Sequence, residues 1–184
     1  MALQTAPDQT VTEPVTLLAL KNRLKLTATT DDGQLTGHIT AAREFAERVT
    51  NRCLAARQFI DYRDRFPYPS EDLHIPAPPL VSVDLVEFLD NTYTWQTWDS
   101  TEYWVAANNL PAVLQPKVGF AYPFPVKARD SVRITFTAGA GLPVIGVPQH
   151  WQTNILDIAI FMYENAGVMK VPTDLVNIPR IYVF

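Results

Sequence analysis

The sequence predicts an α+β fold, in which a small bundle of three main helices carries an inserted antiparallel β region, with extended N- and C-terminal tails. Apolar residues recur every three or four positions near both ends of the chain and every second position between them, which are the periods of helices and strands. The 184 residues are 47% hydrophobic and 18% charged, so the chain can bury a real core. Its length corresponds to one ordinary domain, or to a helical domain with a large insertion.

The N-terminal part predicts an arm followed by a short helix. Residues 1–13 are small and polar, which is typical of a flexible arm. The first helix is expected over residues 14–26, with Thr16 as its N-cap. Its apolar positions, Leu17, Leu20 and Leu24, are spaced by three and four residues.

A longer helix is expected over residues 31–54. Asp31 or Asp32 is suited to cap it and to complement the positive helix N-terminus. The apolar seam consists of Leu35, Ile39, Ala42, Ala46, Val49 and Cys53. Cys53 is the single cysteine of the chain, which excludes an intrachain disulfide and suits a reducing cytoplasm. Its place on the seam indicates a buried, inert thiol.

Residues 56–140 carry the β pattern. The clearest strand is around Val132, Ile134 and Phe136, where apolar and polar residues alternate. Further strands are expected around Phe59–Tyr62, at residues 73–75, around Val81–Leu85 and at residues 103–105. A turn at residues 90–92 predicts that residues 93–98 pair back as a hairpin.

The last helix is expected over residues 148–166 and is followed by a tail, residues 167–184. Pro148 is well placed for the first helical turn. The helix is apolar almost all round, which indicates burial on several sides, within its own domain or against neighbouring subunits. The tail ends in the apolar run Ile181, Tyr182, Val183 and Phe184.

No catalytic or metal-binding pattern emerges. The histidines, His38, His74 and His150, lie in different segments without metal-ligand spacing, so we expect no metal, no cofactor and no enzyme. A net charge of −4 and a pI near 5.3 disfavour tight nucleic-acid binding. Residues 1–10 have no signal-peptide pattern, and the longest apolar stretch, residues 155–163, is too short to cross a membrane.

Aromatic side chains gather in one part of the β region. The candidates for a contact surface there are Trp95, Trp98, Tyr103 and Trp104. Cross-strand packing or burial at a subunit contact explains them best, and stacking on sugars or bases is the alternative.

The order of these segments resembles the head–tail connector, or head-completion, proteins of long-tailed bacteriophages and gene transfer agents. The Pro-rich strand at residues 75–83 reads Ile-Pro-Ala-Pro-Pro-Leu-Val-Ser-Val, and the last helix ends in Tyr-Glu-Asn, as is common in that family. The other matching segments are residues 13–26, 31–47, 64–67 and 132–139. The resemblance covers residues 13–166 and departs from the family at the aromatics, at the Pro-rich stretch 111–125 and in the tail.

The resemblance implies a structural virion protein made in the bacterial host cytoplasm. Such adaptors form a dodecameric ring below the portal protein, extend the DNA channel without sequence-specific binding, and dock the next connector or the tail. The helical and tail residues expected at subunit or portal contacts are Trp151, Ile155, Phe161, Tyr163, Ile178, Ile181, Tyr182 and Phe184. The alternatives are a tail-terminator or tail-completion protein, or a carbohydrate-binding module that uses the aromatics of residues 93–104.

Overall fold

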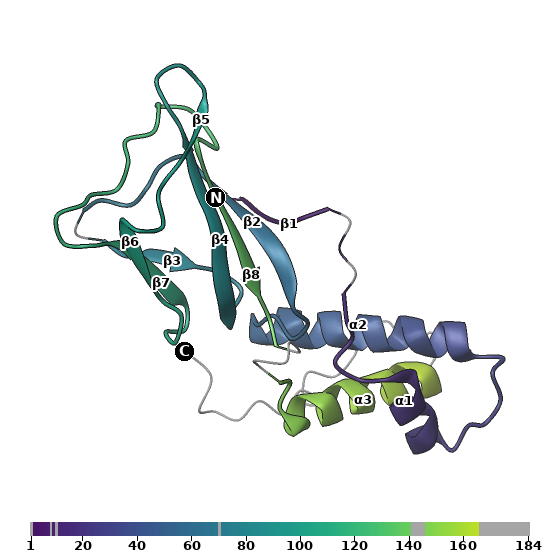
Figure 1. The fold of residues 1–184 in the computed structure, drawn as a ribbon. Helices are drawn as coiled ribbons and strands as arrows, with labels where there is room; N and C mark the ends of the chain where they lie inside the picture. The colour runs from purple at the N-terminus through teal and green to yellow at the C-terminus, as the bar shows by residue number, and fades with distance from the viewer. Residues whose placement is uncertain (1, 8, 10, 70, 141–145, 166–184) are drawn as a thin grey trace. The chain divides into compact units, whose positions relative to one another are not determined.

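The computed structural model describes residues 2–7, 9, 11–69, 71–140 and 146–165. Within them the chain forms two compact units (Figure 1). The β unit comprises residues 1–11 and 56–139, and the helical unit comprises residues 12–55 and 140–184. The sequence predicted a single connector domain over residues 14–166 with a β insertion at residues 56–140. The β unit contains most of that insertion together with the N-terminal segment.

The helical unit is built on α1 (Leu17–Leu24), α2 (Asp32–Thr50) and α3 (Gln149–Glu164). The predicted N-cap is confirmed, since the Thr16 hydroxyl accepts a hydrogen bond from the Ala19 N–H at 3.2 Å. Helix α2 ends four residues earlier than residue 54, because Asn51 adopts the left-handed conformation that commonly ends helices. Helix α3 has Pro148 at its N-cap position.

The core of the helical unit lies between the helices, which pack against one another (Figure 1). The predicted seam of α2 faces this core. The buried apolar residues of the three helices are Leu20, Leu35, Ile39, Ala42, Ala46, Trp151, Ile155, Leu156, Ile158 and Ala159. Cys53 is also buried, as predicted, and its thiol donates to the Ala55 carbonyl at 3.1 Å.

A buried cluster of charges, which we call the Arg43 cluster, lies on α2 beside that core. The Arg43 guanidinium contacts the carboxylates of Glu47 at 2.8 Å and Glu13 at 2.9 Å. The Glu47 carboxylate also accepts the backbone N–H groups of Leu54 and Ala55, at 2.7 and 3.2 Å. The cluster thus joins the middle of α2 to the segments before α1 and after α2. The sequence did not predict it, because Arg43 lies off the apolar seam.

The β unit contains antiparallel strands in two sheets. One sheet has the order β1-β2-β8-β4-β5 and the other has the order β3-β7-β6. The strands are β1 (Ala2–Thr5), β2 (Arg57–Arg63), β3 (Leu73–Ile75), β4 (Leu80–Leu89), β5 (Trp95–Thr97), β6 (Tyr103–Ala106), β7 (Ala112–Pro116) and β8 (Val132–Ala138). The predicted hairpin is confirmed, because β5 pairs with the end of β4, with Leu89 opposite Trp95.

Alternation in β8 is the pattern that the sequence predicted. Val132, Ile134, Phe136 and Ala138 are buried, while the residues between them are half-buried. Strand β8 is central, with β2 on one side and β4 on the other, as Figure 1 shows. Two strands were not predicted. Strand β7 lies in the Pro-rich stretch, and β1 lies in the segment expected to be a flexible arm.

Strand β1 pairs with β2 along residues 2–5, with Gln4 opposite Ile60. All its side chains are exposed, so main-chain hydrogen bonds are its principal contacts. The Gln9 side chain extends this pairing, since it donates to the Gln58 carbonyl at 2.9 Å and accepts the Gln58 N–H at 2.6 Å. A polar strand of this kind has no apolar period for sequence reasoning to detect.

Candidate interaction surfaces

The contact residues predicted on the last helix divide into core and surface positions. Trp151 and Ile155 are buried in the core of the helical unit, which leaves their side chains no surface to offer a partner. Phe161 and Tyr163 are half-buried. The Tyr163 hydroxyl donates to the Asp31 carboxylate at 3.1 Å, and this bond raises the pKa of Tyr163. The tail candidates Ile178, Ile181, Tyr182 and Phe184 lie outside the described residues.

The aromatic candidates of the β unit divide in the same way. Trp98 and Tyr103 are buried, with ring centroids 4.8 Å apart, and burial raises the pKa of Tyr103. Trp95 is half-buried beneath the Arg133 guanidinium, which lies 4.2 Å from the ring centroid. Trp104 is 46% exposed and is the member of this set with an open ring. These positions support the packing interpretation, and they leave little ring surface for stacked sugars.

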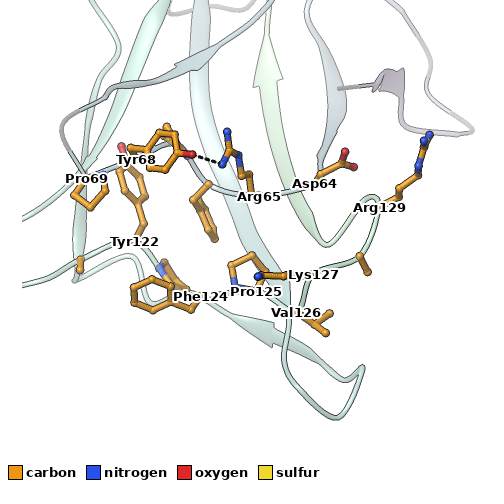
Figure 2. A pocket seen from close by; sticks show the side chains of 15 residues that line it. Asp64, Arg65, Tyr68, Pro69, Tyr122, Phe124, Pro125, Val126, Lys127 and Arg129 are labelled. Atoms are coloured by element: carbon orange, nitrogen blue, oxygen red, sulfur yellow. Dashed lines mark hydrogen bonds between the residues drawn. The ribbon is translucent and has the colours of Figure 1, made fainter.

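A groove that the sequence did not predict lies in the β unit, between two segments outside the strands. Its volume is about 650 Å³, and residues 64–69 and 121–129 line it. We call it the Pro-aromatic groove. Figure 2 shows its lining side chains, most of which are apolar. Its prolines and aromatics are Phe66, Pro67, Tyr68, Pro69, Tyr122, Pro123, Phe124 and Pro125.

The floor of the groove is fixed by buried aromatic rings. Phe66 stacks on Tyr122 with centroids 5.6 Å apart, and Trp98 packs edge-on against Phe66 at 5.4 Å. The Tyr122 hydroxyl donates to the Leu114 carbonyl at 3.1 Å, which ties the floor to β7. Burial raises the pKa of Tyr122. The groove is therefore preorganised, because its floor belongs to the core of the β unit.

The rim of the groove is aromatic and open to solvent. Phe124 is 89% exposed and Tyr68 is 56% exposed. The Arg65 guanidinium lies 4.5 Å from the centroid of the Tyr68 ring, and its Nη1 donates to the Tyr68 hydroxyl at 2.8 Å (Figure 2). This contact holds both side chains and raises the pKa of Arg65.

The charges around the groove are mostly positive. Arg65, Lys127 and Arg129 are exposed, and among the described residues Lys127 and Arg129 have no ion pair. Asp64 is the acidic residue among the described side chains of the lining, and its carboxylate accepts the Asp130 N–H at 3.0 Å. In a chain with a net charge of −4, the lining of the groove is therefore locally cationic, and the Glu71 carboxylate beside it accepts the Tyr68 N–H at 3.3 Å.

The described residues contain no group of three or more His, Cys, Asp and Glu side chains that could hold a metal ion. None of their helices is both long enough and apolar enough to span a membrane. The available sequence signal for the groove is the clustering of prolines at residues 67–79 and 111–125, which overlaps both lining segments.

Comparison with solved structures gives a match over nearly the whole chain. A chain in the neck of an empty gene transfer agent (GTA) particle, computed with C6 symmetry, has a TM-score of 0.77 and 18% identity, covering 93% of this chain and 88% of that chain. The protein has the fold of a GTA neck chain.

Two further matches come from similar particles. A chain in the virion of a native GTA particle has a TM-score of 0.73 and 20% identity, covering 94% of this chain and 90% of that chain. A chain in the neck of a native GTA particle, computed with C12 symmetry, has a TM-score of 0.68 and 20% identity, covering 94% and 88%. Neither protein-family models nor curated proteins give a match.

Proposed function

We propose that the protein is a structural virion component at the head–tail neck of a phage-like or gene-transfer-agent particle, and that it acts as a head–tail adaptor. The observation that carries this proposal is the match to the neck chain at a TM-score of 0.77, which covers 93% of this chain. The helical bundle and the inserted β region are both included, so the likeness extends beyond a common motif. The proposed role is structural and requires no cofactor.

In the proposed assembly, copies of the chain form a ring, with twelve as the expected number. The C6 and C12 symmetries of the matching neck structures support a multi-copy ring, since either symmetry is compatible with twelve copies. A ring requires head-to-tail contacts between two different surfaces of each copy. The half-buried Phe161 and Tyr163 of α3, and the exposed Trp104 of β6, are candidates for those contacts.

The partners in this proposal are the portal protein on one side and the next connector or tail protein on the other. Genomic DNA would pass through the ring without sequence-specific binding, in keeping with the net charge of −4. The direct test is the mass of the purified chain alone and after mixing with the portal of the same particle. We expect a large complex that forms only in the mixture. A chain whose mass is the same with and without the portal would contradict the proposal.

The tail has its own test. We propose that residues 178–184 dock on the portal or on a neighbouring subunit, because they combine several large apolar side chains. A chain truncated after residue 166 should remain folded by circular dichroism but fail to join particles. A full-length control with Ser at Ile178, Ile181, Tyr182 and Phe184 should fail in the same way. Truncated protein found in particles would contradict the docking role.

A further inference from the structure

We infer that the Pro-aromatic groove binds a short acidic segment of another protein, whose apolar side chains enter the groove while its carboxylates meet Arg65, Lys127 and Arg129. Binding at this groove does not require the proposed ring. It rests on the composition of the groove, the rigidity of its floor and the charges at its rim.

The groove has the characteristics of a recognition surface. Its volume of about 650 Å³ is within the range of sites that accept a few side chains or a small ligand. Phe124 is 89% exposed beside prolines on both sides of it in the sequence, so apolar area here faces water without any cover from the described chain. Aromatic side chains that a partner buries in this way are often the residues that contribute most of the binding energy of an interface.

Binding at this groove would require little ordering of its own side chains. The floor rings belong to the packed core, the prolines restrict the backbone of both walls, and Arg65 is already held against Tyr68. Preorganisation of this kind lowers the entropy cost of association.

The charges indicate an acidic partner. Lys127 and Arg129 are exposed at the groove and lack ion pairs among the described residues. Together with Arg65 they outnumber the Asp64 carboxylate, which accepts the Asp130 N–H and keeps its negative charge. Carboxylates of a partner would find complementary charge here, whereas a basic segment would be repelled. Because the rim stays solvated, this charge contributes mainly to the choice of partner and the rate of encounter.

A protein segment fits the groove better than a nucleic acid. Single-stranded nucleic acids stack successive bases on a series of open aromatic faces. Here Phe66 and Tyr122 are buried, and Arg65 lies over the Tyr68 ring, which leaves Phe124 as the open ring of the groove. Three cations also neutralise few phosphates, so the salt-dependent affinity typical of nucleic-acid binding would be small.

The test is selection of a random dodecapeptide display library on the immobilised full-length chain. We expect enriched peptides that combine aspartate or glutamate with large apolar residues. Enrichment on a Lys127→Glu, Arg129→Glu double variant should shift from acidic to basic peptides. A matched control is Val118→Ser, which changes an equally exposed apolar residue outside the groove lining and should leave the selected sequences unchanged.

The best enriched peptide, synthesised with a fluorescent label, is then titrated against the variants. Phe124→Ser should weaken binding about tenfold, and the charge-reversed double variant by at least as much. Peptides without carboxylates, no enrichment at all, or binding unaffected by both changes would overturn the inference. Tighter binding of a synthetic peptide of residues 166–184, or Phe124-dependent binding of an oligothymidylate, would overturn it in favour of the chain's own tail or a nucleic acid.

Discussion

Removing the guanidinium of the Arg43 cluster should destabilise the helical unit strongly. In the variant Arg43→Met the aliphatic stem is kept, but the bonds to Glu47 at 2.8 Å and to Glu13 at 2.9 Å are lost. The Arg43 side chain is 5% exposed and that of Glu47 is 8% exposed, so the Glu47 carboxylate cannot replace this partner with bulk water. The cost arises mainly from this buried negative charge, since breaking a buried pair from one side is far more costly than omitting the pair.

The size of the loss in unfolding free energy depends on the hydrogen-bond partners that Glu13 and Glu47 keep in the Arg43→Met variant. Glu13 is 22% exposed and can rehydrate, and Glu47 keeps the N–H groups of Leu54 and Ala55. These contacts place the loss at the lower end of the range for broken buried pairs, at about 3 kcal/mol of unfolding free energy. Urea denaturation near neutral pH, followed by far-ultraviolet circular dichroism, measures it. Arg48→Met changes an exposed arginine of the same helix and should cost less than about 0.5 kcal/mol.

A double variant separates lost charge balance from lost packing. Adding Glu47→Gln to Arg43→Met removes the negative charge but keeps a side-chain carbonyl that can accept the Leu54 and Ala55 N–H groups. The double variant should therefore recover part of the loss. Two results would refute the reasoning. One is an Arg43→Met variant that loses less than about 1 kcal/mol of unfolding free energy, and the other is a double variant whose loss equals the sum of the losses of Arg43→Met and Glu47→Gln measured separately.

Three further perturbations test other contacts. Burial raises the pKa of the Asp61 carboxyl above its ordinary value of 3.8, although the neighbouring Arg63 lowers it. Protonated Asp61 therefore stabilises the folded chain fully below pH 3.8, and this stabilisation is lost as the pH rises through the pKa of the folded state. The stability of the native chain relative to Asp61→Asn should thus fall from acid to neutral pH in urea titrations, and a rise would contradict the assignment. Ile155→Ala should cost about 3 kcal/mol by circular dichroism because the side chain is fully buried, whereas an unchanged stability with impaired assembly would return Ile155 to an interface role. Trp95→Ala should cost about 1 kcal/mol in denaturant titrations through loss of the Arg133 contact, and an unchanged midpoint would show that this contact contributes nothing.

Local periodicity predicted the elements that have one apolar face. The seam of α2 and the alternation of β8 are of this kind, and both were predicted close to their observed bounds. Strand β7 was missed because it lies in a Pro-rich stretch, with Pro111 before it and Pro116 as its last residue, and proline is disfavoured inside strands. Strand β1 was missed because its side chains are all exposed and its principal contacts are main-chain hydrogen bonds, which leave no apolar pattern in the sequence.

The surfaces were harder to predict than the elements. An apolar helix shows that burial is needed but not which neighbour supplies it, so Ile155 could be assigned equally to a core or to a subunit contact. The Pro-aromatic groove depends on residues 64–69 and 121–129, which are separated in the sequence by a large part of the β region. Their juxtaposition is a property of the tertiary structure. Arg43 illustrates the same limit, because its partner Glu13 lies 30 residues away in the sequence.

The β insertion begins and ends at neighbouring points in space. Arg57 pairs with Ala138 at the ends of β2 and β8, and the Ala140 N–H donates to the Cys53 carbonyl at 3.2 Å. For an unstructured loop of the length of residues 56–139, the closure entropy that separates α2 from α3 would be about 4 kcal/mol, against roughly 1 kcal/mol for a loop of a few residues. Once β2 and β8 have paired, the two ends of the insertion are held together, so the insertion adds little loop-closure entropy to the folding of the helical bundle.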